Sequence, residues 1–164
     1  MKILILNGPN LNLLGIREPE IYGNQSYNDL CKRIKAHAAE ISVEVEIRQT
    51  NHEGVLVDWI QAAGGFYEQI QSPGGSFDGV RDPRERFDGL VLNPGGYTHT
   101  SVALPDAIRA AGIPTVEVHI SDPDQREPFR RISYVRQACV KTIVGKGFDG
   151  YIEAIDHLKL TIDN

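Results

Sequence analysis

Residues able to carry acid–base chemistry gather at the ends of short apolar runs in the sequence. The loop after the first run, LNLLGIREPEIYG, holds Arg17 and Tyr22 five residues apart. Three later runs end in loops that carry a histidine, namely His52, His99 and His119. A single histidine at a strand end is more often a structural hydrogen-bonding group. Several polar loops that converge favour a catalytic interpretation, because a site needs its titratable groups in one place.

Other chemistries fit these residues less well. The segment NGPN (7–10) lacks the spacing of a dinucleotide fingerprint and has no Lys-Ser/Thr pair, so a nucleotide-phosphate loop is not expected. Glu117 and His119 share one face of a strand and could ligate a metal ion, with His99 or His52 as a third ligand. Spacing alone leaves this alternative open, and we favour a site without metal.

The apolar runs alternate with amphipathic segments, which predicts strands alternating with helices. Three runs are nearly continuous in apolar residues, as expected of strands buried on both faces, whereas VEVEIRQ alternates and is placed at a sheet edge. The five runs are KILILN (2–7), VEVEIRQ (43–49), DGLVLN (88–93), IPTVEVHI (113–120) and ACVKTIVG (138–145).

Helix signals occupy the intervals between these runs. Ser26 followed by Asp29 is a variant of the capping box, and Gly112 followed by Pro114 marks a helix end. Two further helices are expected at 54–63 and 149–160. The order predicts an α/β fold: a flavodoxin-like doubly wound five-stranded parallel sheet with helices on both faces, in a single domain over 1–164. Ligands of such sheets bind at the carboxyl ends of the strands, where the polar loops lie.

Composition narrows the classes of partner and compartment. The 164 residues carry a net charge of −5 and their basic residues are scattered, so no nucleic-acid surface is expected. No apolar run is long enough for a membrane helix or a signal peptide. Cys31 and Cys139 are predicted to be buried free thiols, which favours a cytoplasmic location. Residues 64–87 are rich in glycine and are interpreted as a surface insertion in preference to a lid.

Six segments, in this order, closely resemble the type II 3-dehydroquinate dehydratases. They are NGPNLNLLGIREPEIYG, QTNHEG, DWI, NPGGYTHTSVAL, EVHIS and REPFR, and the resemblance covers nearly the whole chain. It implies a flavodoxin-like fold, in agreement with the strands and helices predicted above. The family's reaction removes water from 3-dehydroquinate through an enolate, without a Schiff-base lysine, and we expect no metal or other cofactor. The resemblance implies a place in the shikimate pathway of aromatic amino-acid biosynthesis or in quinate breakdown.

The resemblance implies that the loop 8–24 is a lid carrying the base. Tyr22 would take the proton next to the ketone, and Arg17 would stabilise its phenolate and the transition state. A free tyrosine has a pKa of about 10, so lowering it by two or three units requires about 3–4 kcal/mol, which a neighbouring arginine can supply. Glu18 either orients Arg17 or is a solvated charge.

The same resemblance implies the remaining catalytic roles. Asn10 would hold an ordered water on the enolate oxygen. His119 would donate a proton to the leaving hydroxyl, and Glu117 would hold its imidazole tautomer. Two rival interpretations are a metal-dependent hydrolase using Glu117, His119 and His99, and a non-catalytic flavodoxin-like binding module.

Substrate contacts are also implied by the family. The Asn93 side chain and the backbone N–H groups of Ile120 and Ser121 are expected at the carboxylate of the substrate. His99 and Arg130 are expected at the ring hydroxyls.

Asp106 matches a residue that reaches the site of a neighbouring subunit, in trimers that build a homododecamer. Surface ion pairing is the alternative for both Asp106 and Arg130. The segment DPDQ (122–125) and Pro105 depart from the usual family pattern. These departures leave open the shape of the loop before Arg130 and the position of Asp106.

Overall fold

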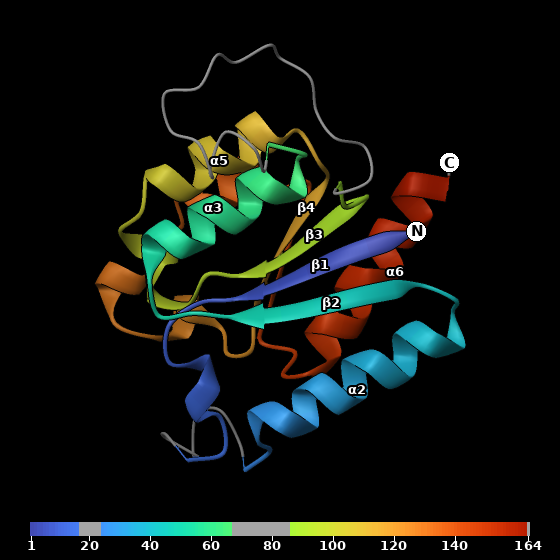
Figure 1. The fold of residues 1–164 in the computed structure, drawn as a ribbon. Helices are drawn as coiled ribbons and strands as arrows, with labels where there is room; N and C mark the ends of the chain where they lie inside the picture. Colours follow the sequence, from blue (N-terminus) through green and yellow to red (C-terminus); the bar gives the residue numbers. More distant parts are fainter. Residues whose placement is uncertain (17–23, 67–85, 164) are drawn as a thin grey trace.

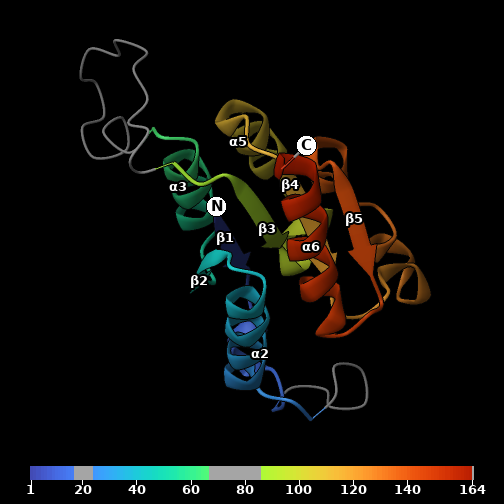
Figure 2. The same ribbon diagram turned by 90° about the vertical axis from the view of Figure 1, so that its right-hand side faces the viewer.

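The computed structural model describes residues 1–16, 24–66 and 86–163. Within them, five parallel strands form one sheet in the order β2-β1-β3-β4-β5. The strands are β1 (Lys2–Asn7), β2 (Glu44–Gln49), β3 (Gly89–Asn93), β4 (Thr115–His119) and β5 (Lys141–Val144). The predicted five-stranded parallel sheet is therefore confirmed, and β2 lies at an edge as its alternating sequence indicated. Figure 2 shows β2 and β5 on opposite sides of the sheet.

Helices cover both faces of the sheet, which confirms the doubly wound arrangement (Figure 1). One face carries α2 (Tyr27–Glu40) and α6 (Asp149–Asp163), and the other carries α3 (Glu53–Ala63) and α5 (Ala103–Ala111). Side chains alternate along β1, so each face receives its own core. Ile3 and Ile5 pack in the core with α2 and α6. Leu4 and Leu6 pack in the core with α3 and α5.

The strand order places the polar loops side by side. The chain passes from β1 to the edge strand β2 and then returns across β1 to β3, so the loops after β1 and β3 are neighbours. This reversal of direction is where doubly wound sheets form their ligand sites. Short 3-10 helices build the loops: η1 (Leu11–Leu13), η2 (Gly95–His99), η3 (Pro123–Gln125), η4 (Pro128–Arg130) and η5 (Val135–Ala138).

Local signals set most of the boundaries. The Ser26 hydroxyl accepts a hydrogen bond from the Asp29 N–H at 3.2 Å, and the Asp29 carboxylate accepts one from the Ser26 N–H at 3.0 Å. This confirms the capping box at the start of α2. Gly112 ends α5 in a left-handed conformation, with φ +63°.

Some predictions need correction. β5 begins at Lys141 rather than at residue 138, because η5 extends to Ala138 and the Cys139 N–H bonds back to the Arg136 carbonyl oxygen. α6 continues to Asp163, beyond the predicted end at 160. Cys31 and Cys139 are free thiols as predicted, but they are half-buried rather than buried.

Parts of two predicted segments lie outside the described residues. They are residues 17–23 of the predicted lid and residues 67–85 of the predicted insertion, and both interpretations stay predictions. Among the residues that the structure describes, no helix has the length and apolar character needed to cross a membrane.

Candidate active site

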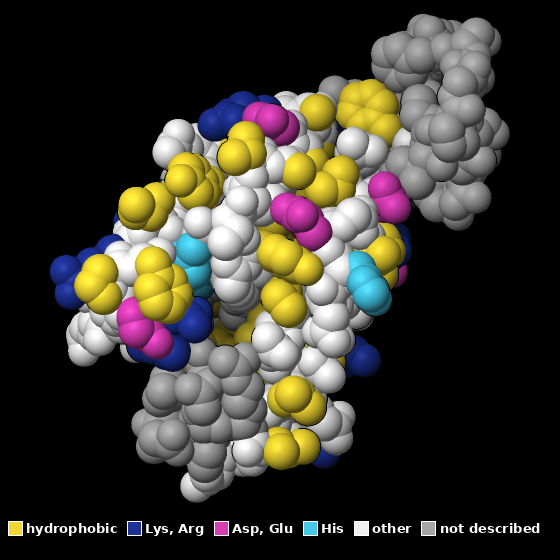
Figure 3. All heavy atoms as spheres, turned by 90° about the vertical axis from the view of Figure 1, so that its left-hand side faces the viewer, with side chains coloured by type: hydrophobic (Ala, Val, Ile, Leu, Met, Phe, Trp, Pro, Cys, Tyr) yellow, Lys and Arg dark blue, Asp and Glu magenta, His cyan; other side chains and the backbone are white. Residues whose placement is uncertain are grey.

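A pocket opens at the carboxyl ends of β1, β3 and β4, where the sheet was predicted to bind its ligand. Figure 3 shows the molecule from this end, where basic and hydrophobic side chains gather along one side. Three loops line the pocket, and they bring together most of the predicted site residues. These are Asn10, Asn93, His99, His119, Ile120, Ser121 and Arg130.

Two predicted site residues that the structure describes, Asp106 and Glu117, do not line this pocket. Arg17 and Tyr22 lie outside the described residues, and so does Glu18. Asp106 lies on α5, pairs with Arg109 at 3.1 Å and has a side chain 69% exposed. The ion-pairing alternative for Asp106 therefore holds within one chain, whereas its predicted contact with a second subunit stays a prediction.

A glycine lets the loops after β1 and β3 pack against each other. The Gly8 N–H donates to the Asn93 carbonyl oxygen at 2.8 Å. A Cβ at Gly8 would lie 2.5 Å from the carbonyl oxygen of Pro94, closer than a carbon atom can approach. Glycine at this position therefore brings the NGPN and NPGG segments together and sets the position of Asn10 beside the end of β3.

Asn10 adopts a left-handed backbone conformation, with φ +68°. This region costs most L-residues about 1–2 kcal/mol, and asparagine is among the residues that tolerate it. The Asn10 N–H donates to Asn51 Oδ1 at 3.0 Å, and the same oxygen accepts from Gln49 Nε2 at 3.0 Å. The Tyr97 hydroxyl donates to the Asn51 carbonyl oxygen at 2.8 Å. Asn51 therefore connects the loops after β1, β2 and β3.

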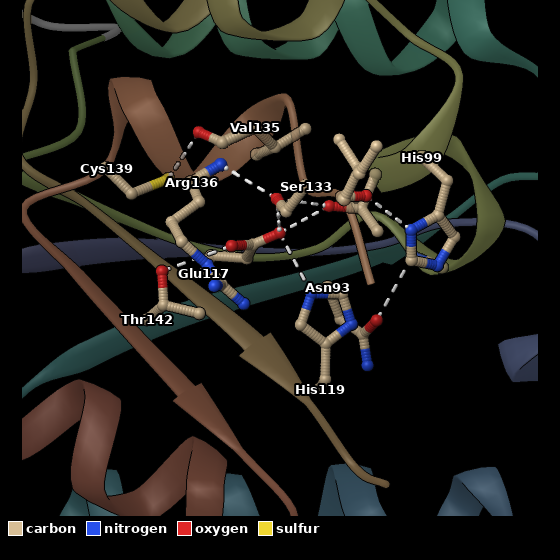
Figure 4. A network of polar contacts seen from close by, with 12 residues as sticks. Asn93, His99, Glu117, His119, Ser133, Val135, Arg136, Cys139 and Thr142 are labelled. Carbon is tan, nitrogen blue, oxygen red and sulfur yellow. Dashed lines mark hydrogen bonds and ion pairs between the residues drawn. The ribbon is translucent and has the colours of Figure 1, made fainter. Parts of the chain in front are cut away.

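Glu117 and His119 form the buried centre of the site (Figure 4). Both residues lie on β4 and point to the same face of the sheet. His119 Nε2 lies 2.9 Å from Glu117 Oε1, so Nδ1 is the ring nitrogen left for a ligand. The same carboxylate oxygen accepts from the hydroxyls of Thr98 at 2.5 Å and Ser133 at 2.9 Å, and Oε2 accepts from Thr142 at 3.2 Å.

These contacts keep the buried carboxylate ionised. Burial by itself raises the pKa of Glu117. The hydrogen bond and charge of His119, together with the hydroxyls of Thr98 and Ser133, outweigh burial and lower the pKa below its usual range. A fixed negative charge beside His119 holds the ring in one orientation, with Nδ1 as the nitrogen left for a ligand.

His99 faces the pocket as a neutral ring. Burial lowers its pKa, against the opposing effect of a hydrogen bond to the Ile132 carbonyl oxygen. The ring nitrogen Nδ1 lies 2.7 Å from that oxygen and must donate to it, because a carbonyl only accepts. Nε2 is therefore a hydrogen-bond acceptor, suited to a hydroxyl group of a ligand.

Neutral donors form another wall of the pocket. The backbone N–H groups of Ile120 and Ser121 donate no hydrogen bond to any part of the chain that the structure describes. Asn93 is buried and uses one hydrogen of Nδ2 in a bond to the Tyr151 hydroxyl at 2.8 Å, which leaves the second hydrogen for a ligand. Together these donors suit a carboxylate.

Two arginines of the loop after β4 line the pocket. Arg130 Nε donates to Glu127 Oε2 at 3.0 Å, and Arg126 Nε lies 3.5 Å from the same oxygen. Arg130 therefore both forms the alternative ion pair and lines the pocket. Arg126 was noted in the sequence only as part of REPFR, yet its side chain is 15% exposed and also lines the pocket.

The metal alternative lacks a ligand set in the described residues. No group of three or more His, Cys, Asp or Glu side chains is placed there to hold a metal ion. Glu117 and His119 pair with each other, and Glu117 directs its remaining contacts to hydroxyls. His52 is exposed at the start of α3 and does not line the pocket.

The fold and this site define the chain as an α/β protein with an acid–base pocket at the carboxyl ends of its strands. The family model described as dehydroquinase class II matches residues 1–78 and 67–159. The chain belongs to the dehydroquinase class II family.

Individual relatives agree over almost their whole length. A protein of Clostridium acetobutylicum named 3-dehydroquinate dehydratase is 48% identical over 159 residues, which are 97% of this chain and 96% of the relative. One from Variovorax paradoxus with the same name is 49% identical and covers 94% of this chain and 95% of the relative. The crystal structure of the type II dehydroquinase from Butyrivibrio crossotus matches with a TM-score of 0.82 and 46% identity, over 97% of each chain.

Several site residues were not identified from the sequence. Thr98, Ser133 and Thr142 surround Glu117, although they lie in three different segments of the chain. Thr142 could have been found from the sheet, because it is the register partner of Glu117 on β5. Asn51 stands inside QTNHEG and gave no signal beyond its motif.

Proposed function

We propose that this chain is an enzyme, a hydro-lyase that converts 3-dehydroquinate into 3-dehydroshikimate and water. The observation that carries the proposal is the Glu117–His119 pair beside a pocket whose wall offers N–H donors that no other described residue engages. The names of the relatives specify the substrate, and the described part of the site supports the proposal with an acid–base pair and with donors suited to an anion. The product places the enzyme in the shikimate pathway of aromatic amino-acid biosynthesis.

The reaction begins with proton abstraction next to the ketone. In this proposal Tyr22 is the base, and Arg17 stabilises the phenolate because a cation favours the charged form of a neighbouring phenol. The electron pair moves onto the ketone oxygen as an enolate. Asn10 holds a water that donates to this oxygen, and its left-handed backbone fixed by Asn51 supports that role.

The second step expels the hydroxyl group. Protonated His119 gives its proton to the leaving oxygen, the enolate collapses, and water leaves as the carbon–carbon double bond forms. The ionised Glu117 stabilises the imidazolium before the transfer. The four hydrogen bonds to its carboxylate keep that charge in place inside the protein.

The substrate is held by its carboxylate and its hydroxyls. The free N–H groups of Ile120 and Ser121 and the second amide hydrogen of Asn93 bind the carboxylate. His99 accepts a hydrogen bond from a ring hydroxyl through Nε2, and Arg130 donates to another. The neutral form of His99 supports this assignment, because an imidazolium could not accept.

We also propose that the protein assembles as trimers within a dodecamer, in which Asp106 reaches the site of a neighbour. Apolar side chains exposed on a single chain support an interface: Val102 is 63%, Phe129 64% and Ile132 57% exposed. Exposed apolar surface of this kind favours association. Sedimentation velocity of the wild-type protein tests the assembly, and a monomer would contradict it.

Free thiols at Cys31 and Cys139 support a cytoplasmic location.

The test of the activity is the ultraviolet absorbance of the purified protein mixed with 3-dehydroquinate, because the product is a conjugated enone. We expect a rising signal in the wild type, a large loss in Tyr22→Phe, and no effect of borohydride, since no imine forms. A folded wild-type protein without any rise would overturn the proposal. A rise that Tyr22→Phe leaves intact would refute the assignment of the base alone.

A further inference from the structure

A chain of buried hydrogen bonds runs beneath the pocket and ends at Asn93. The Tyr151 hydroxyl, contributed by α6, donates to Asn7 Oδ1 at 2.7 Å. The same hydroxyl accepts from Asn93 Nδ2 at 2.8 Å. Asn7 and Tyr151 are 0% exposed and Asn93 is 3% exposed, so water does not compete for these groups. Asn7 and Tyr151 do not line the pocket, so neither belongs to the ligand-contacting wall.

Backbone groups at the two ends fix the direction of this chain. The Arg48 carbonyl can only accept, and Asn7 Nδ2 donates to it at 3.4 Å, so Asn7 Oδ1 faces Tyr151. The hydroxyl hydrogen of Tyr151 is then engaged with Asn7, and only a lone pair remains for Asn93. At the other end, the Gly95 N–H can only donate, and it donates to Asn93 Oδ1 at 3.2 Å.

We propose that Tyr151 and Asn7 are positioning residues that fix the orientation of the Asn93 amide. The inference rests on the proposed contact between Asn93 and the substrate carboxylate. In the observed orientation the second hydrogen of Nδ2 is available to that carboxylate. An amide turned by 180° would instead present an oxygen lone pair to the anion. The network therefore selects a donor over an acceptor at the wall that binds the negative charge.

The direct test is Tyr151→Phe, which removes one hydroxyl and keeps the ring. Without that hydroxyl Asn93 Nδ2 loses its acceptor and Asn7 Oδ1 loses its donor. We expect KM for 3-dehydroquinate to rise about tenfold while kcat changes less than about threefold, because the contact holds substrate and transition state alike.

A matched control is Tyr27→Phe. The Tyr27 hydroxyl contacts the other end of the Asn7 amide, where it accepts from Nδ2 at 3.5 Å. The control therefore deletes the same atom beside the same residue and leaves the Asn7–Tyr151–Asn93 bonds in place. We expect its KM to stay within about twofold of the wild type, as for a weak contact removed from the ligand.

The decisive readout is a ratio of affinities measured within each variant. Dissociation constants are measured for 3-dehydroshikimate and for its methyl ester, which lacks the negative charge. Tyr151→Phe is expected to weaken binding of the acid about tenfold and of the ester less than about twofold. The ratio does not depend on the fraction of protein that is folded, so a loss of stability cannot imitate the result.

Asn93→Ala separates this inference from the proposed function. If Asn93→Ala lowers the acid-to-ester preference and Tyr151→Phe does not, the positioning role is wrong while the carboxylate contact stands. If neither variant changes the preference, the contact of Asn93 is wrong and the inference falls with it. If Tyr151→Phe weakens the acid and the ester equally, the tyrosine has a structural role only, and the inference is also refuted.

Discussion

Replacing Glu117 by glutamine isolates the role of its charge. Glutamine keeps the volume of the side chain and one carbonyl oxygen in the place of Oε1, where His119, Thr98 and Ser133 donate. Its new N–H₂ group meets the Thr142 hydroxyl, which can turn to accept. Every buried polar group thus keeps a partner, and we expect the free energy of unfolding at neutral pH to change by less than about 1 kcal/mol.

Activity should respond much more strongly than stability. A hydrogen bond to a charged group contributes about 1.5–3 kcal/mol and a neutral one about 0.5–1.5 kcal/mol, so losing the charge weakens the stabilisation of protonated His119 by about 1–2 kcal/mol. At about 1.4 kcal/mol for each factor of ten, kcat should fall roughly five- to thirtyfold. KM should change little, because Glu117 is buried behind His119 and does not line the pocket.

The assay is the enone absorbance at neutral pH, run beside urea unfolding of the same samples. Thr142→Val is the matched control, because it removes one hydrogen bond from Glu117 Oε2 and keeps the charge. We expect the control to lose about 0.5–1.5 kcal/mol of stability and to retain kcat within about threefold. Wild-type kcat in Glu117→Gln would refute the argument, and so would an equal loss of kcat in both variants.

Three further predictions concern packing, loop geometry and pH. A Cβ at Gly8 would lie 2.5 Å from a backbone oxygen of the loop after β3. Gly8→Ala should therefore lower the urea midpoint by the equivalent of about 1–3 kcal/mol. Gly54→Ala is the control and should not lower it, because a Cβ at Gly54 would meet open space. Asn51→Ala should cost about 1–2 kcal/mol and speed hydrogen exchange of the Asn10 amide, and unchanged exchange would contradict that role. The pKa of His99 is lowered in the folded protein, so its contribution to stability is present above a pH of about 6.5 and is lost as the pH falls. The free energy of unfolding of His99→Gln should therefore depend less on pH between pH 7 and 5 than that of the wild type.

The fold could be predicted because its signals are local and repeat along the chain. Continuous apolar runs identified β1, β3 and β4, and all three are buried on both faces. The start of β5 was wrong for a physical reason. Residues 138–140 have apolar side chains suited to a strand, but Cys139 bonds back to Arg136 in a 3-10 turn, and composition does not distinguish the two conformations.

The site was predictable in its location and only partly in its contacts. Strand ends and motif order were enough to bring His99, Asn93 and His119 to one pocket. The partners of Glu117 could not be read in the same way, because Thr98 and Ser133 lie on different loops and meet the carboxylate only after β4 and its neighbours have packed. Hydroxyl residues are common throughout the chain, so their types alone carry little information.

The distribution of charge in the site separates binding from catalysis. Substrate and product carry the same carboxylate, so a strong cation at that position would hold both equally and would not lower the barrier. The wall formed by Ile120, Ser121 and Asn93 offers neutral donors instead, which can recognise an anion without an opposing charge. In the proposed mechanism the buried charge of Glu117 acts beside His119, where a proton moves. Defects at the wall should therefore appear in KM and defects at Glu117 in kcat, and a reversed pattern would require the two roles to be exchanged.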